Sequence, residues 1–246
     1  MTLVQDFARS TAGCPSMAEL KALVEAAAFE LSFDYFALVH HVRFGHPAAG
    51  AVRLTNYPLD WLAVVRERNR LVDPILRAAE RASGGFRWDS LERVVSLTER
   101  ERAVLKQAAR HGIGPGFTIP NHVPGETFGS CHFAVGVGKT LPDQNTYAAH
   151  LIGSFAFDAA RRLVEQVDGS EAHQEPAPLT DRQRECLVFA AKGKSDSVIG
   201  QLLNIKPATV NEHIEAAKRR YCVATRTQLI VRALFRSEIL YSELLS

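Results

Sequence analysis

The chain has 246 residues, of which 46% are hydrophobic and 23% charged, a composition typical of a folded globular protein with one large domain or two smaller ones. No apolar run approaches the roughly 18 residues of a membrane helix, and no signal-peptide pattern is visible at the start, so we expect a cytoplasmic protein without a membrane partner. The four cysteines are widely separated and form no CxxC pair, which argues against a disulfide framework or a zinc site and predicts buried free thiols: Cys14, Cys131, Cys186 and Cys222.

Charge is distributed unevenly along the chain. Residues 1–170 carry 18 basic and 18 acidic side chains, whereas residues 179–236 carry 11 basic and 5 acidic ones. Between these regions, residues 168–177 contain acids, a glycine and a proline but no large apolar side chain, which predicts a linker. We therefore expect a neutral domain over residues 1–167 and a basic domain over residues 178–246, and only the basic domain is expected to meet a polyanion.

Helix and strand signals alternate in the first domain. Apolar spacing predicts a helix over MAELKALVEAAAFEL, and DYFALVHHV and AVRLTNY are typical of strands. Next come a helix within NYPLDWLAVVRERNRLVDP, a helix over residues 74–82, and a short strand FRW. In LTERERAVLKQAARHG, Thr98 and Glu101 have capping-box spacing, and Gly112 provides a left-handed stop.

The remainder of the first domain predicts a hairpin and a long helix. GFTIPNHV and GSCHFAVGV flank a turn at PGE, and the helix runs from about residue 143 to 167. This order of elements predicts an α+β fold, in which helices cover an antiparallel sheet as an α-β-α sandwich. The adjacent His40 and His41 point to opposite faces of their strand and therefore make a poor metal pair.

Helix signals follow one another closely in the basic domain, which we expect to be a small all-α helix-turn-helix unit. Thr180 and Gln183 form a second capping box, Gly193 ends that helix, and Ser195 can cap the next one. The apolar residues of this second helix are expected to share one buried face: Val198, Ile199, Leu202 and Leu203. A short turn over residues 204–206 leads to Pro207, which suits the first position of a third helix.

The third helix has the properties of a recognition helix. Its buried stripe is predicted to be Val210, Ile214, Ala217 and Tyr221, and its outward side chains Asn211, Glu212, Glu215, Lys218, Arg219 and Arg220. Such a helix is anchored by its apolar side and offers polar groups to base edges and cations to phosphates. A solvated charged face is the alternative, but the short turn and the net charge of the domain favour DNA binding.

The segment LTDRQRECLVFAAKGKSDSVIGQLLNIKPATVNEHIEAAKRR resembles the DNA-binding domain of LuxR-type transcription factors. The resemblance implies that the third helix enters the major groove and that the last helix, TQLIVRALFRSEIL, helps the protein form a homodimer, so a palindromic operator is expected. Pro207 replaces the usual Ser or Thr, and Asn211 stands where many members have Lys or Arg, which affects the base sequence that is read. The implied DNA-binding residues are Lys194, Ser195, Thr209, Asn211, Glu212, His213, Glu215, Lys218 and Arg219. A packing role for His213 between helices is an equal alternative.

The first domain resembles the acyl-homoserine lactone binding domain of quorum-sensing LuxR-type receptors in the segments NYPLDW, DP, FRWD and GPGFTIPNHVPGE. The resemblance implies that Trp61 donates to the lactone carbonyl, Asp73 accepts from the ligand amide, Tyr57 donates to the acyl carbonyl, and Trp88 stacks near the lactone ring. Burying a neutral amide ligand is tolerable only where the protein supplies such matched partners. The implied ligand-binding residues are Tyr35, Tyr57, Trp61, Val65, Asp73, Ile75, Trp88, Gly116, with a mainly structural role, and His132.

Each of these residues also has a purely structural explanation. Tyr57 and Trp61 could be core aromatics, Asp73 before Pro74 is an ideal helix start, and His132 could pack under a helix instead of facing the acyl group. Their joint occurrence ahead of a matching DNA-binding domain favours ligand sensing.

Two departures from the family pattern concern the acyl side of the pocket. Many members have a tyrosine where this chain has Val65, and the distance from Trp61 to Asp73 is one residue shorter than usual. We therefore predict a ligand other than the commonest straight-chain lactones, such as a branched or aryl homoserine lactone. Alternatives are a regulator that answers a non-lactone small molecule, or one without a ligand. GxSxG, HExxH, P-loop and CxxC motifs are missing from the sequence, so we expect neither an enzyme nor a cofactor.

Overall fold

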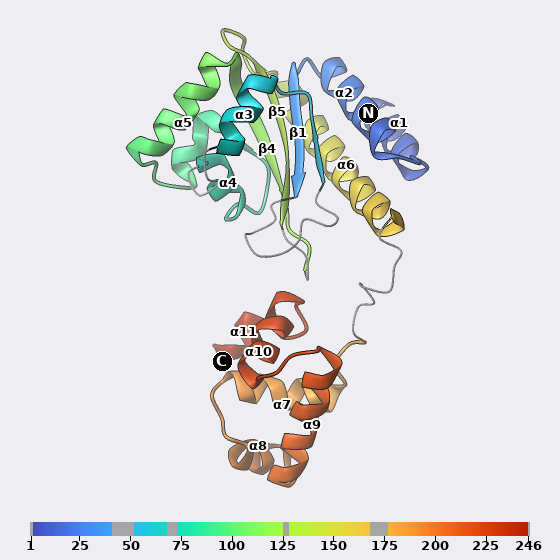
Figure 1. Cartoon of the computed structure of the whole chain (residues 1–246), viewed down its shortest axis with the longest axis vertical. Coiled ribbons are helices and arrows are strands. Elements are labelled where there is room, and N and C mark those ends of the chain that lie inside the picture. The colour runs from blue at the N-terminus through green and yellow to red at the C-terminus, as the bar shows by residue number, and fades with distance from the viewer. Residues whose placement is uncertain (1, 41–51, 68–72, 125–127, 168–176, 246) are drawn as a thin grey trace. The chain divides into compact units, whose positions relative to one another are not determined.

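The computed structural model describes residues 2–40, 52–67, 73–124, 128–167 and 177–245. These residues belong to two compact units, one that ends with a long helix at Val167 and one that begins after it (Figure 1). The predicted linker, apart from residue 177, and His41 of the histidine pair lie outside the described residues. Within the described ranges, no helix combines the length and the apolar character needed to cross a membrane.

A five-stranded antiparallel sheet forms the centre of the first unit. Its strand order is β2-β1-β5-β4-β3, so the predicted hairpin of β4 and β5 is confirmed and lies inside the sheet. The strands are β1 (Tyr35–His40), β2 (Arg53–Thr55), β3 (Phe86–Arg87), β4 (Ile113–Asn121) and β5 (Gly129–Gly136).

Strand register determines which side chains share a face of this sheet. Val39 lies opposite both Arg53 and Ser130, and Ala37, two residues earlier, lies opposite His132. Paired residues project to the same face, and side chains alternate along a strand, so these residues share one face, called the cavity face below. The intervening residues project to the other face and form a buried apolar layer: Phe36, Leu38, Ile119, Cys131 and Phe133.

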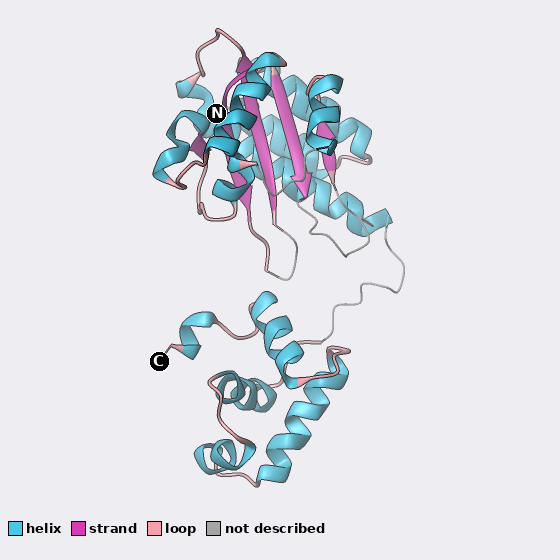
Figure 2. Cartoon of the chain, turned by 60° about the vertical axis from the view of Figure 1, so that its left-hand side comes forward, coloured by secondary structure: helices cyan, strands magenta, loops and turns pink. Residues whose placement is uncertain are grey.

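Helices cover both faces of the sheet (Figures 1 and 2). The apolar layer packs against α2 (Met17–Glu30) and α6 (Thr146–Val167), and α1 (Thr2–Ala12) packs on these two helices. The cavity face is covered by α3 (Leu59–Glu67), α4 (Pro74–Ala79) and α5 (Glu99–Arg110). Two 3₁₀ helices, η2 (Trp88–Arg93) and η3 (Asp143–Asn145), complete the unit. The predicted α-β-α sandwich is therefore confirmed. Helix α1 was not predicted, although Leu3, Val4 and Phe7 are spaced as on one face of a helix.

Local capping signals position the helices on the cavity face. The hydroxyl of Thr98 accepts from the backbone of Glu101, whose carboxylate returns to the Thr98 amide, so the predicted capping box starts α5. Asp73 caps α4 through the Ile75 amide at 2.9 Å, with Pro74 in the first turn. Helix α4 ends at Ala79, three residues before its predicted end, and the chain continues as a turn.

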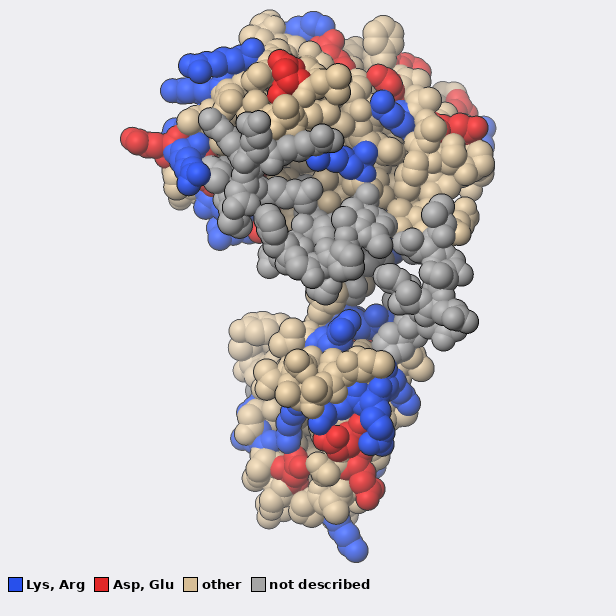
Figure 3. Space-filling model, in the orientation of Figure 1, with Lys and Arg blue, Asp and Glu red and all other residues tan. Residues whose placement is uncertain are grey.

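The second unit is entirely helical in its described residues. Its helices are α7 (Asp181–Ala191), α8 (Asp196–Leu203), α9 (Pro207–Arg220), α10 (Arg226–Phe235) and α11 (Tyr241–Leu244). The predicted capping box at Thr180, the cap at Ser195 and the left-handed Gly193 are all present. Lys and Arg side chains are spread over the visible face of this unit (Figure 3).

The prediction that four apolar residues of α8 share one buried face is wrong for two of them. Ile199 of α8 is fully buried, but Val198 and Leu202 are 38% and 55% exposed. Helix α8 is short and packs mainly on α9, so only the stripe near Ile199 and Leu203 reaches the core. An i, i+4 pair such as Val198 and Leu202 forms a neighbouring stripe about 100° around the helix, which remains outside.

The cysteine prediction holds for two of the four thiols. Cys131 and Cys186 are buried, whereas Cys14 is half-buried and Cys222 is exposed, and all four are free. Cys222 follows the last residues of α9 with a positive φ of 51°, so it belongs to a turn at the surface.

Candidate functional site

A cavity of about 450 Å³ lies between the cavity face of the sheet and helices α3, α4 and α5. Its wall over the sheet is apolar, because it consists of aliphatic side chains from these helices: Leu62, Val65, Ile75, Leu76, Val104, Leu105, Ala108 and Ala109. The volume falls within the range of about 300–1,000 Å³ that small-molecule sites occupy.

Three polar side chains, Tyr57, Trp61 and Asp73, line this cavity and are called the polar cluster below. The indole N–H of Trp61 and the hydroxyl of Tyr57 donate to no other residue in the described part of the chain. Burial raises the pKa of the Tyr57 hydroxyl, with a smaller contribution from the Asp73 carboxylate, so Tyr57 remains a proton donor. A ligand with carbonyl oxygens would accept from both of these donors.

Asp73 caps a helix and also lines the cavity. Its Oδ1 caps α4 by accepting from the Ile75 amide, and the same carboxyl group lines the cavity. A carboxyl group has several acceptor positions, so capping does not exhaust its capacity. Burial raises the pKa of this carboxyl, as expected for a group removed from water.

A buried chain of hydrogen bonds runs beneath the cavity. The indole Nε1 of Trp88 donates to Thr118 Oγ1 at 2.8 Å, and the same oxygen lies 2.8 Å from His132 Nδ1. The other ring nitrogen of His132 lies 2.6 Å from Ser130 Oγ. Burial lowers the pKa of His132 to about 4, so its ring is neutral at pH 7, and one nitrogen donates while the other accepts.

Gly116 and Tyr35 support the cavity without lining it. A Cβ on Gly116 would lie 2.6 Å from ring atoms of Trp88, so a glycine is required for Trp88 to rest on β4. The ring of Tyr35 meets that of Tyr57 edge-on, with centroids 5.9 Å apart. The other predicted ligand-binding residues all line the cavity: Tyr57, Trp61, Val65, Asp73, Ile75, Trp88 and His132.

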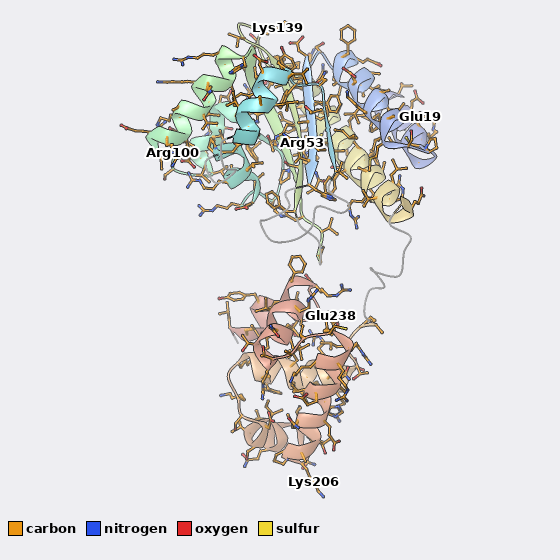
Figure 4. All side chains as sticks on the ribbon, viewed as in Figure 1. Glu19, Arg53, Arg100, Lys139, Lys206 and Glu238 are labelled. Atoms are coloured by element: carbon orange, nitrogen blue, oxygen red, sulfur yellow. The ribbon has the colours of Figure 1, made fainter. Side chains whose placement is uncertain are left out.

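The sequence interpretation missed several cavity residues, among them Arg53 and Thr55. Both lie on β2, the edge strand next to β1, where Figure 4 labels Arg53. They precede Tyr57 by four and two residues, so strand alternation in AVRLTNY could have placed them on the same face as Tyr57. The helix α5 residues were recognisable only as core candidates, because no local signal distinguishes a cavity wall from a packed core.

In the second unit, α8 and α9 form a helix-turn-helix. Asn204 ends α8 in the left-handed conformation, with φ 54°, and Lys206 precedes Pro207 at the start of α9. A Cβ on Gly200 would lie 2.7 Å from the Ile205 carbonyl oxygen, so this glycine permits the close approach of the turn to α8. The predicted turn over residues 204–206 is therefore confirmed.

Helix α9 is anchored by its apolar stripe and presents polar side chains on its other side. The predicted stripe of Val210, Ile214, Ala217 and Tyr221 is buried. Asn211, Glu212 and Arg219 are exposed, whereas Glu215 and Lys218 are half-buried and form an ion pair at 2.8 Å. Of the other predicted DNA-binding residues, Lys194 and Ser195 are exposed before α8, and Thr209 and His213 are half-buried on α9.

Glu238 joins several parts of this unit behind the recognition helix. Its carboxylate accepts from the Leu179 amide at 3.0 Å and from the Tyr221 hydroxyl at 2.5 Å. Arg184 donates to the Glu238 carbonyl at 2.9 Å and pairs with Glu243 of α11 at 2.6 Å. Helix α11, which lies beyond the segment that resembles the DNA-binding domain, is thereby attached to α7.

Comparisons with known proteins match both units. Residues 16–160 match the family model of the autoinducer binding domain, and residues 177–233 match that of the bacterial regulatory proteins of the luxR family. The transcriptional activator protein BjaR1 of Bradyrhizobium diazoefficiens is 27% identical over 214 residues, which cover 84% of this chain and 86% of BjaR1. AhyR of Aeromonas hydrophila, also a transcriptional activator protein, is 28% identical over 208 residues, which cover 82% and 78% of the two chains.

Among solved structures, Escherichia coli SdiA has the same fold. It superposes with a TM-score of 0.67 at 24% identity, over 97% of this chain and 98% of SdiA. A second structure, SdiA in complex with octanoyl-rac-glycerol, matches with a TM-score of 0.65. From the two family matches, the chain belongs to the LuxR-type regulators of quorum-sensing transcription, with an autoinducer-binding domain followed by a LuxR-family DNA-binding domain.

Proposed function

We propose that the cavity of the first unit binds an acyl- or aryl-homoserine lactone and that this binding controls the DNA-binding activity of the second unit. The polar cluster carries the proposal, because two donors without protein partners and one carboxyl group face an otherwise apolar cavity. An acyl-homoserine lactone offers one amide donor and two carbonyl acceptors, which matches this set.

The resemblance to acyl-homoserine lactone binding domains implies the expected contacts, and the chemistry of each side chain is compatible with them. The indole of Trp61 donates to the lactone carbonyl, the hydroxyl of Tyr57 donates to the acyl carbonyl, and Asp73 accepts from the amide N–H. Trp88 lies against the lactone ring and cannot offer its own N–H, because Thr118 already accepts that proton. The acyl group is left with the aliphatic helices and the sheet.

The shape of the acyl side favours a branched or aryl group over a straight chain. Val65 lines the cavity where many family members carry a tyrosine, which removes a hydroxyl and leaves space beside α3. A branched or aryl acyl group fills such a space with more contacts than an unbranched alkyl chain.

Two copies of the chain are expected to bind a palindromic operator in the cytoplasm, with α9 of each copy in a major groove. Exposed apolar side chains provide surfaces for such a homodimer. Tyr147, Leu151 and Phe155 are spaced four residues apart on α6, and Val231 and Phe235 are spaced in the same way on α10. Apolar stripes of this kind are typical of protein interfaces.

The test compares two substitutions in the polar cluster with a neighbouring control. Trp61→Phe removes the indole donor with little change in packing, and Asp73→Ser removes the carboxylate but keeps a capping oxygen for α4. Each is expected to weaken binding of homoserine lactones by about tenfold or more, the loss for one buried hydrogen bond, and to abolish the ligand response of operator binding. Leu59→Ala, on the 83% exposed residue of α3, should leave binding unchanged.

Binding is measured by calorimetry on the full chain with a panel of straight-chain, branched and aryl homoserine lactones, and the DNA response by fluorescence anisotropy of a labelled operator. Unchanged affinity and response in both variants would refute the site. Tightest binding of ordinary straight-chain lactones would refute the proposed acyl shape while leaving the site intact.

A further inference from the structure

Residues of neighbouring strands form rows across the floor of the cavity, and the strand register determines which residues share a row. The first row contains Tyr35 and Ala134, opposite each other, and the second contains Ala37 and His132. The third contains Val39, which lies opposite both Arg53 and Ser130. All three rows project to the cavity face.

The polar cluster and Arg53 belong to different ends of this floor. Tyr57 packs on Tyr35, at the first row, and Trp88 rests on Gly116, which pairs with Ala134 of the same row. Arg53 of β2 pairs with Val39 in the third row. Val39 follows Tyr35 by four residues along β1, which corresponds to about 13 Å at the usual rise of a strand. A ligand whose head occupies the polar cluster would therefore direct its acyl tail toward Arg53.

Arg53 is the single Lys or Arg among the described residues that line the cavity, and Asp73, in the polar cluster, is the single acid. The guanidinium has five N–H donors in a planar fork, and the Arg53 side chain is exposed and has contacts within the protein. A planar carboxylate is the group that such a fork binds best.

The other polar groups near the tail have their hydrogen bonds inside the protein. Both ring nitrogens of His132 meet hydroxyl groups, and Thr55 donates to the Phe36 carbonyl at 2.9 Å and accepts from the Tyr57 amide. Arg53 differs from these groups because it carries the single Lys or Arg charge among the described lining residues, and this charge attracts a negatively charged tail.

We infer that Arg53 is a specificity-determining residue that selects a signal whose acyl tail ends in a carboxylate. The inference rests on the proposed function, since it takes the lactone head to lie in the polar cluster. A tail of this kind would approach Arg53 from within the cavity, while the apolar helices pack along its hydrocarbon part.

The experiment compares two probes of equal carbon number, hexanoyl-homoserine lactone and adipoyl-homoserine lactone, which differ in the carboxylate at the tail. Affinities for the full chain are measured by calorimetry at low and high salt. The wild type is expected to bind the adipoyl probe about tenfold more tightly, as one charge-assisted hydrogen bond implies, and salt should reduce this preference. Arg53→Met keeps the length and apolar stem of the side chain and should bind the hexanoyl probe more tightly than the adipoyl probe. Arg53→Lys should retain part of the adipoyl preference.

A wild type that binds the hexanoyl probe at least as tightly overturns the inference, and so does an Arg53→Met variant with the wild-type ratio of affinities. The latter result is expected if the guanidinium serves only to reach solvent. Failure of a folded wild type to bind either probe, or any other homoserine lactone, is a different result, because it overturns the proposed function and the inference with it.

Discussion

The buried imidazole of His132 should make the stability of the sensor unit depend on pH. Burial lowers its pKa from an ordinary value of 6.5 to about 4. Between these values the unfolded chain binds a proton that the folded protein does not, so the free energy of unfolding falls as the pH falls. A shift of this size corresponds to about 3 kcal/mol in the free energy of unfolding. This stabilisation is lost progressively below pH 6.5 and is fully lost below pH 4.

The physical cause is visible in the contacts of the ring. A protonated imidazole must donate from both nitrogens, so Thr118 Oγ1 and Ser130 Oγ would each have to accept, and these neutral hydroxyl oxygens compensate only in part for the lost hydration of a buried cation. His132→Gln removes the titration and keeps hydrogen-bonding groups in place. Ser130→Ala removes one partner of the ring but keeps the imidazole, so it should retain the wild-type pH dependence.

Urea unfolding of the full chain, followed by tryptophan fluorescence between pH 7 and pH 4, measures this effect. Both tryptophans of the chain, Trp61 and Trp88, belong to the sensor unit, so the signal reports on that unit alone. The wild type should lose up to about 3 kcal/mol more than His132→Gln over this range. Asp73, whose raised pKa acts in the opposite direction, is present in both proteins and cancels in the difference. Equal pH dependence of the two proteins would refute the reasoning.

Two glycines give further predictions. Gly116→Ala places a methyl group 2.6 Å from the Trp88 ring, so the ring must move and lactone affinity should fall about tenfold in calorimetry; Gly84→Ala, with open space around it, should not change affinity. Gly200→Val pushes the helix-turn-helix turn away from α8 and should destabilise the DNA-binding unit by about 2 kcal/mol in thermal unfolding, with weaker operator binding. Ser197→Ala, at an exposed position of α8, is its control, and equal effects of control and variant would contradict either prediction.

Features set by neighbouring residues were predictable from the sequence. The capping boxes at Thr98 and Thr180 and the stops at Gly112 and Gly193 depend on contacts within one helical turn, and all are present. The helix-turn-helix followed from the same kind of signal, together with the short turn before Pro207.

Features set by long-range pairing were harder to predict from the sequence. Alternation in AVRLTNY could place Arg53 on the same face as Tyr57, but no local pattern reveals the pairing with Val39 that sets its position along the cavity floor. Similarly, the exposure of Val198 and Leu202 depends on how many neighbours α8 has, and in this small unit it has too few to bury two stripes. That Asp73 both caps α4 and lines the cavity needed the structure, because the sequence signature of a helix cap does not place the carboxyl group relative to a cavity.

The identity of the molecule that the cavity binds is the most direct test of the proposed function. Full-length protein expressed in its native host, purified and then denatured, would release its small molecules for mass spectrometry. The account predicts a homoserine lactone with a branched or aryl acyl group, and with a carboxylate at the tail, present in the wild type and strongly reduced in Trp61→Phe. A stoichiometric ligand of another chemical class, or equal amounts from both proteins, would contradict it.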